Sequence, residues 1–368
     1  MMIAVENIGF AYGNHETVFD DFSFTVARGE ILAIIGPSGG GKTTLLYLLA
    51  GLRMPRSGRV CIDGLPLNRP RPGNGLVLQD HGLLPWSTVR DNVALGLKIR
   101  RFYGPDGRHS PDDATIDPAV ADQKIAYWLS RLDIADLADK YPAQISRGQR
   151  QRTAIARSLV KDASLLLLDE PLSNLDAKLR EELRFEIKSL VRRMGITAVY
   201  VTHDQAEAMV ISDRIAVMDS GNVVQIGNPR DIYQEPANRF VADFIGTMNF
   251  MSGEVVAVMD DQSTVSVRTE FIDNLLCATP DSASATLGAN VYASIRPEDV
   301  EVSTEPPQAT ENVFKGEIVH KAYLGNFLFF FVSVNDTMIR VQAPHYLAQE
   351  EGQEIFLYLN PQKCMILT

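Results

Sequence analysis

The sequence predicts an α/β fold: a first domain built on a mostly parallel sheet, followed by a β-rich second domain. Two observations carry this prediction. Over the first part of the chain, short apolar runs alternate with helical stretches, which is the pattern of buried strands with helices packed on them. After about residue 245, short β-type runs recur, as in a small sandwich or barrel. We therefore place the two domains at residues 1–245 and 246–368.

The elements of the first domain follow in order. Residues 3–5 and 22–26 carry β-type side chains, and 31–35 form a continuous apolar run typical of a strand buried on both faces. A helix is expected at 43–50, ending at Gly51. Further strands are expected at 75–79, 165–168 and 197–201, with helices at 176–194 and 205–210.

Residues from about 87 to 160 contain no strand pattern, so we expect a helical subdomain there. Within it, the polar stretch 103–113 is rich in Gly and Pro and is expected to be a surface loop. In the second domain the predicted strands are 253–258, 264–269, 291–295, 314–319, 327–334, 338–342 and 354–359.

Composition excludes several classes of protein. The net charge of −11 argues against a general nucleic-acid binder, which needs a basic face toward phosphates. Cys61, Cys277 and Cys364 are far apart in sequence and are expected to be isolated reduced thiols. No signal-peptide pattern and no run of about 18 apolar residues occurs. We therefore expect any action at a membrane to go through a partner.

A phosphate-binding loop follows the apolar run 31–35. Backbone N–H groups of such a glycine-rich turn converge on phosphate oxygens, and the next helix adds the positive end of its dipole. Lys42 is expected to reach the β- and γ-phosphates, and the Thr43 hydroxyl to bind Mg²⁺. The expected nucleotide contacts are Gly36, Pro37, Ser38, Gly39, Gly40, Gly41, Lys42, Thr43 and Thr44.

A second motif is the apolar run 165–168, which ends in Asp169 and Glu170. A strand of this kind carries its last residues to the sheet edge where ligands bind in open α/β folds. Asp169 is expected to hold Mg²⁺ through water, and Glu170 to polarise the attacking water.

A third motif lies between them, at 145–152, where Ser146, Gly148 and Gln149 open a predicted helix. A helix N-terminus presents free N–H groups to an anion, and glycine allows close backbone approach. Together, the order of these motifs resembles that of ATP-binding cassette (ABC) ATPase subunits, and the resemblance covers the whole chain.

The resemblance implies roles for further residues. Tyr12 resembles the aromatic residue that stacks on adenine, Gln79 the glutamine that senses Mg²⁺ and the attacking water, and His203 the histidine on the γ-phosphate. The loop 173–176, ending in Asp176, resembles the loop that crosses to a partner subunit. The resemblance further implies that two copies close around two Mg·ATP, with Ser146 and Gly148 on the γ-phosphate bound by the opposite copy.

Arg147 departs from the family pattern, which most often has glycine at this position. Arginine resists positive φ and adds a charge. Either the backbone here is ordinary right-handed, or ATP-dependent dimerisation is altered; we expect the first.

Three kinds of ABC protein compete: an importer subunit, an exporter nucleotide domain made as a separate chain, and a soluble non-transport ATPase. The third usually has two cassettes or a long coiled coil, whereas this chain has one phosphate loop and no sustained heptads. The second leaves residues 246–368 unexplained. The segments 294–300 and 322–326 resemble the transport-associated OB domain of importer ATPases, which favours the first.

An importer subunit implies partners. These are a second copy, two integral-membrane permease subunits, and an external solute-binding protein, with the ATPase peripheral at the cytoplasmic face of the inner membrane. The apolar loop Leu83, Leu84, Pro85 and Trp86 is the expected permease docking site. The second domain is similar to those of polyamine and ferric-iron importers, while anion or phosphonate importers stay open.

Overall fold

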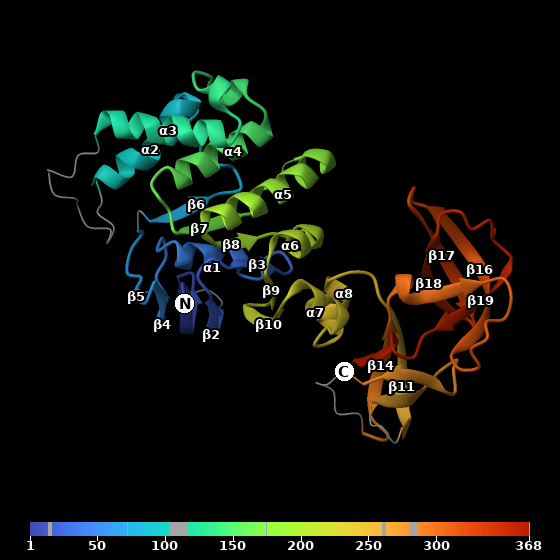
Figure 1. Cartoon of the computed structure of the whole chain (residues 1–368). Helices are drawn as coiled ribbons and strands as arrows, with labels where there is room; N and C mark the ends of the chain where they lie inside the picture. Colours follow the sequence, from blue (N-terminus) through green and yellow to red (C-terminus); the bar gives the residue numbers. More distant parts are fainter. Residues whose placement is uncertain are drawn as a thin grey trace. The chain divides into compact units, whose positions relative to one another are not determined.

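The computed structural model describes residues 1–13, 17–71, 73–102, 117–173, 175–259, 263–279 and 286–367. The chain forms two compact units, Met1–Asp231 and Ile232–Thr368 (Figure 1). The first is an α/β unit and the second is β-rich, which confirms the predicted fold class. The expected loop at 103–113 lies outside the described residues.

The central sheet of the first unit has six strands. In spatial order they are β10 (Asn222–Gly227), β9 (Arg214–Asp219), β3 (Ile31–Ile35), β8 (Thr197–Val201), β7 (Leu165–Asp169) and β6 (Asn74–Val77). All but the edge strand β10 run parallel. The parallel strands therefore bring the chain that follows each of them to one edge of the sheet.

A smaller antiparallel sheet covers one face of this unit. Its order is β2 (Thr17–Val26), β1 (Ile3–Ala11), β4 (Ser57–Ile62) and β5 (Leu65–Pro66). Side chains alternate along β7, so Leu165 and Leu167 pack with this sheet and with α1 (Lys42–Leu49). Leu166 and Leu168 pack on the opposite face, among the other helices.

The other helices of this unit are α2 (Val89–Phe102), α3 (Pro118–Arg131), α4 (Arg147–Leu159), α5 (Ala177–Met194) and α6 (Gln205–Ile211), with short 3₁₀ turns at Ala135–Leu137 and Pro142–Gln144. Helices α2, α3 and α4 pack on one another where the helical subdomain was predicted (Figure 1). Helix α4 also contacts β6, and α5 contacts α6. No helix among the described residues is long and apolar enough to cross a membrane.

The second unit contains a closed barrel and a five-stranded sheet that share one core. The barrel order is β11 (Asn249–Val258), β12 (Thr264–Thr269), β13 (Leu275–Ala278), β20 (Met365–Leu367) and β14 (Asn290–Ile295). The sheet order is β15 (Val300–Ser303), β19 (Glu354–Leu359), β16 (Val313–Tyr323), β17 (Phe327–Val334) and β18 (Thr337–Pro344), with a 3₁₀ turn at Pro297–Asp299.

The division between the units differs from the boundary expected after residue 245. Helix α7 (Pro229–Gln234) spans the division, and α8 (Arg239–Phe244) belongs to the second unit. The buried Arg296 explains this, because its guanidinium donates hydrogen bonds to the carbonyls of Tyr233, Ala242 and Thr247. Because Arg296 lies far from these three residues in the sequence, no short sequence pattern indicates that α8 packs with the second domain.

The expectation of three isolated thiols is wrong for two of them. All three cysteines are free and buried, but the Sγ atoms of Cys277 and Cys364 lie 3.3 Å apart. The reason is the barrel, which places β13 beside β20.

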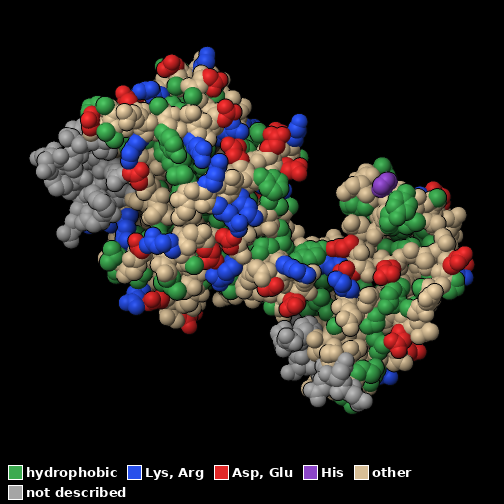
Figure 2. Space-filling model, in the orientation of Figure 1, with side chains coloured by type: hydrophobic (Ala, Val, Ile, Leu, Met, Phe, Trp, Pro, Cys, Tyr) green, Lys and Arg blue, Asp and Glu red, His purple; other side chains and the backbone are tan. Residues whose placement is uncertain are grey.

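On the face of each unit drawn in Figure 2, acidic and basic side chains are interspersed.

Candidate nucleotide site

The phosphate-binding loop connects β3 to α1 at the carboxyl edge of the central sheet. Its last residue, Gly41, caps α1 with a φ of 91°. A side chain there would be strained, and its Cβ would lie 3.0 Å from the ring of Phe19. Glycine at this position therefore lets the chain turn sharply into α1, whose first N–H groups face the loop.

Lys42 folds back over this loop. Its Nζ donates hydrogen bonds to the carbonyls of Gly36 (2.9 Å) and Pro37 (2.8 Å). Burial lowers the pKa of Lys42, while the nearby carboxylates of Glu170 and Asp169 act in the opposite direction. The lysine is thus held at the loop with its charge beside two acidic groups.

The two residues after Lys42 contact groups from other elements. The Thr43 hydroxyl donates to Oδ1 of Asp169 at 3.2 Å, which joins α1 to the end of β7. Asp169 is only 6% exposed, and burial raises the pKa of its carboxyl. The Thr44 hydroxyl lies 3.1 Å from the Tyr12 hydroxyl, whose ring is partly exposed.

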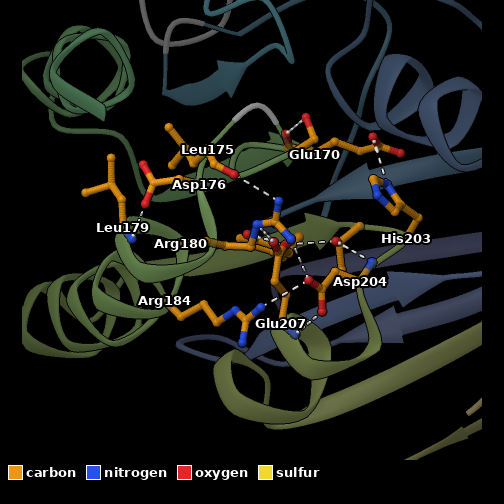
Figure 3. Close-up of polar contacts among 12 residues, drawn as sticks. Glu170, Leu175, Asp176, Leu179, Arg180, Arg184, His203, Asp204 and Glu207 are labelled. Carbon is orange, nitrogen blue, oxygen red and sulfur yellow. Dashed lines mark hydrogen bonds and ion pairs between the residues drawn. The ribbon is translucent and has the colours of Figure 1, made fainter. Parts of the chain in front are cut away.

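Glu170 brings together the other predicted catalytic residues. The side-chain Nε2 of Gln79 donates to its Oε2 at 3.4 Å. Nδ1 of His203 lies 3.1 Å from the same oxygen (Figure 3). Glu170 follows β7 and His203 follows β8, so the neighbouring parallel strands set this distance. Gln79 lies two residues beyond β6, which ends at Val77 rather than at the predicted residue 79.

The residues of the third motif form a separate group at the start of α4. Ser146 is the N-cap: its hydroxyl accepts from the Gln149 N–H (3.2 Å), and Oε1 of Gln149 accepts from the Ser146 N–H (2.9 Å). Arg147 is the first helical residue, so its backbone is right-handed as expected. Gly148 is buried, and a Cβ there would lie 3.0 Å from Cδ2 of Leu179 in α5.

The loop 173–176 follows Glu170 closely and leads into α5. The Ser173 hydroxyl donates to the Glu170 carbonyl at 2.9 Å, and Gln79 Nε2 lies 3.4 Å from the same hydroxyl. Asp176 is the N-cap of α5, where its carboxylate accepts from the Leu179 N–H at 3.0 Å. Asn174 lies outside the described residues.

The first group has the parts needed for phosphoryl transfer to water. The glycine-rich loop and Lys42 could bind phosphates. The oxygen atoms of Thr43 and Asp169 could bind a hard cation such as Mg²⁺. The carboxylate of Glu170, with its two polar neighbours, could bind a water molecule. Ser146 lies at a helix N-terminus, a kind of element that binds anions in many proteins.

Comparison with known proteins agrees with this geometry. The ABC transporter family model matches residues 19–173, and the TOBE domain model matches 293–367. The chain is 38% identical to the spermidine/putrescine import ATP-binding protein PotA of Thermotoga maritima, over 96% of each chain. The chain belongs to the ABC transporter ATP-binding proteins.

Other ABC ATPases are similarly close. The putrescine transport ATP-binding protein PotG of Escherichia coli is 35% identical over all of this chain and 95% of its own. The Fe(3+) ions import ATP-binding protein FbpC of Agrobacterium fabrum is 39% identical, covering 89% of this chain and 86% of its own. These relatives confirm the predicted family resemblance.

Two solved ABC structures resemble the fold. One is cbiO1 of Clostridium perfringens, part of an ABC transporter complex, with a TM-score of 0.56, 28% identity, and coverage of 64% of this chain and 91% of that one. The other is a dimeric ATP-binding cassette in a post-hydrolysis state bound to ADP and Pi, with a TM-score of 0.53, 28% identity, and coverage of 62% and 99%.

One cluster of this ABC ATPase was missed from the sequence. Arg180 and Arg184 of α5 meet Asp204 and Glu207 of α6 (Figure 3). The spacing of Asp204 and Glu207 after a strand is a helix-start signal that was available. The pairing with α5 had no such signal, because the partners are 20 or more residues apart in the sequence.

Proposed function

We propose that this ABC ATPase powers an importer for a polyamine or ferric iron. The relatives described above are import or transport ATP-binding proteins for these solutes, and they align over nearly the whole chain. The exporter and soluble alternatives are less well supported, since neither accounts for the matched TOBE segment. One observation carries the hydrolytic part of the proposal: the meeting of Gln79 and His203 on Glu170.

In this proposal Glu170 is the general base. Its carboxylate accepts a proton from the water that attacks the γ-phosphate, while Gln79 orients that water. His203 contacts the γ-phosphate and fixes Glu170 through their 3.1 Å contact. The φ of Glu170 is 43°, a left-handed value that a glutamate adopts only when its surroundings hold it there. That strain supports a position set for function.

The triphosphate is proposed to lie on the loop from Gly36 to Gly41. Lys42 would then exchange its two carbonyl partners for β- and γ-phosphate oxygens, since its Nζ is already at the loop. The partly exposed ring of Tyr12, beside Thr44, is proposed to stack on adenine.

Mg²⁺ is proposed to be held by Thr43, Asp169 and Gln79. These residues supply hydroxyl, carboxylate and amide oxygens, the ligands that a hard cation prefers. The buried carboxylate of Asp169 fits a cation, because burial raises its pKa and a positive charge would offset that cost. When bound, Mg²⁺ would neutralise charge on the phosphates.

Two copies are proposed to close head to tail around two ATP molecules. In this arrangement Ser146 and Gly148 of one copy, with Gln149 and Asp176, complete the site formed by Lys42 and Glu170 of the other. The position of Ser146 and Gly148 at the start of α4 supports this, because a helix N-terminus favours an anion. The dimeric relative bound to ADP and Pi supports it too.

The apolar loop at Leu83–Trp86 is proposed to seat a permease subunit, with the ATPase peripheral at the cytoplasmic face of the inner membrane and an external solute-binding protein in the complex. Trp86 is 74% exposed. The backbone of Leu84 is held by hydrogen bonds to a buried side chain. The fully buried Asn92 accepts from the Leu84 N–H and donates to the carbonyls of Leu84, Ser87 and Thr88. A rigid loop with an exposed tryptophan suits a protein contact.

The substitution Glu170→Gln tests the proposal. It keeps the shape of the side chain but removes the base, so we expect ATP turnover to fall by about 100-fold or more. ATP binding, measured with a fluorescent analogue, should be retained because the phosphate loop is intact. Glu182→Gln, an exposed carboxylate on α5, is the matched control and should behave as wild type. Turnover near wild type in Glu170→Gln would contradict the role of Glu170.

A further inference from the structure

A charged cluster between α5 and α6 lies beside the hydrolytic residues without contacting the nucleotide loop. Its members are Arg180 and Arg184 of α5, Asp204, which caps α6, and Glu207 in the first turn of α6 (Figure 3). The side chain of Glu207 is only 2% exposed and that of Arg184 only 15%. Charges so well buried are costly unless paired, so their arrangement is specific.

Arg180 contacts two different loops with one guanidinium. Its Nη2 donates to the carbonyl of Leu175 at 3.0 Å, within the loop 173–176. Its Nη1 donates to Oδ2 of Asp204 at 3.3 Å, directly after His203. Its Nε lies 3.9 Å from Oε1 of Glu207. The planar fork of arginine suits such a bridge, because its donors point in fixed, different directions.

The loop that carries His203 is fixed on its other side by Glu207. Oε2 of Glu207 accepts hydrogen bonds from the hydroxyls of Thr202 (2.8 Å) and Tyr200 (3.0 Å). The Thr202 hydroxyl in turn accepts from the Asp204 N–H at 2.9 Å. His203 is therefore held between two residues that are tied to one buried carboxylate, and its ring reaches Glu170 at 3.1 Å.

The loop 173–176 is linked to the Ser146 group. Asp176 caps α5 by accepting from the Leu179 N–H, and the Leu179 side chain packs where a Cβ on Gly148 would lie. A continuous set of contacts thus runs from the N-terminus of α4, through the first turn of α5 and Arg180, to His203 and Glu170. Chains of packed side chains and hydrogen bonds of this kind can carry energetic coupling between sites.

We propose that Arg180 is a positioning residue that couples the loop 173–176 to the loop carrying His203. The inference rests on the proposed function, in which the first loop faces the partner copy and His203 acts at this copy's own ATP. The described contacts of Arg180 are with Leu175, Asp204 and Glu207, not with the phosphate-binding loop. Arg180 ties the position of His203 to the loop that faces the neighbouring copy, and so makes hydrolysis depend on the partner.

Arg184 is the matched comparison. Its Nη2 donates to the same Oδ2 of Asp204 at 3.0 Å, but its described contacts do not reach Leu175. Removing Arg184 therefore weakens the pairing of Asp204 without cutting the bridge between the loops. Arg180→Lys keeps the charge, yet an ammonium cannot serve both Leu175 and Asp204 with the same geometry.

The experiment measures kcat and KM for ATP in wild type, Arg180→Gln, Arg180→Lys and Arg184→Gln, with circular dichroism to check folding. We expect Arg180→Gln to lower kcat about tenfold with KM within about twofold, because ATP binding is untouched. Arg180→Lys should recover less than half of the loss, and Arg184→Gln should stay within about threefold of wild type.

Three outcomes would overturn the proposal: wild-type kcat in Arg180→Gln, an equal loss in Arg184→Gln, or a loss confined to KM. If Arg180→Gln does not fold, Arg180→Lys replaces it in the comparison. We then expect a severalfold loss of kcat at unchanged KM, and a wild-type kcat would overturn the proposal. Absence of ATP turnover in the wild type would instead count against the proposed function.

Discussion

Glu170 shows what single residues could be predicted from the sequence. Its acidic side chain after an apolar strand predicted a position at the sheet edge, and the structure has it there with Gln79 and His203 on one oxygen. The left-handed backbone of Glu170 was not predictable, because no local pattern distinguishes it from an ordinary strand end. Arg180 was not predictable either, since its partners are known only once α5 and α6 are packed.

Arg147 offers a test at this scale. Because it is the first residue of α4 and its backbone is right-handed, glycine is not required there. We expect Arg147→Gly to leave ATPase activity within about twofold of wild type and to cost at most about 1 kcal/mol of stability, the difference in helix propensity. A large gain in activity would mean instead that the arginine restrains the ATP-bound dimer.

Elements that are buried on both faces were the easiest to predict. The apolar runs of β3, β7 and β8 match the observed strands to within a residue. Strand β9 was missed, although its residues 215–218 are buried. Two other missed strands have a physical reason: β10 is a half-exposed edge strand, and β20 has three residues. Helices α2 and α4 pack closely at Gly96 of α2. A Cβ at this position would lie only 2.3 Å from the carbonyl oxygen of Arg157 in α4.

Gly96→Ala therefore tests the contact between α2 and α4. Alanine gains up to about 1 kcal/mol in helix propensity, but the backbone carbonyl cannot move without shifting α4. We expect a net loss of about 2 kcal/mol, measured as a lower denaturant midpoint. Gly73→Ala, where nothing lies within 4 Å of the added Cβ, should be close to wild type. Equal midpoints for the two variants would show that α2 and α4 do not pack this closely.

At the scale of the whole molecule, the proposed function gives the chain two half-sites rather than one complete site. Lys42, Thr43, Asp169, Glu170, Gln79 and His203 form one group, and Ser146, Gly148 and Gln149 form the other. The order of the motifs predicted both groups, and the family assignment rests on the full-length match to ABC importer relatives. In the proposed dimer, the second group of one copy would complete the site formed by the first group of the other.

Mixing two inactive variants tests this central claim most directly. Lys42→Ala disables the phosphate loop, and Ser146→Glu places a negative charge where the partner's phosphate would bind. Each variant alone should hydrolyse little ATP. In an equal mixture, half of the dimers are mixed and each has one intact site, so we expect about a quarter of wild-type activity. Activity no higher than the mean of the two variants would contradict a site shared between copies.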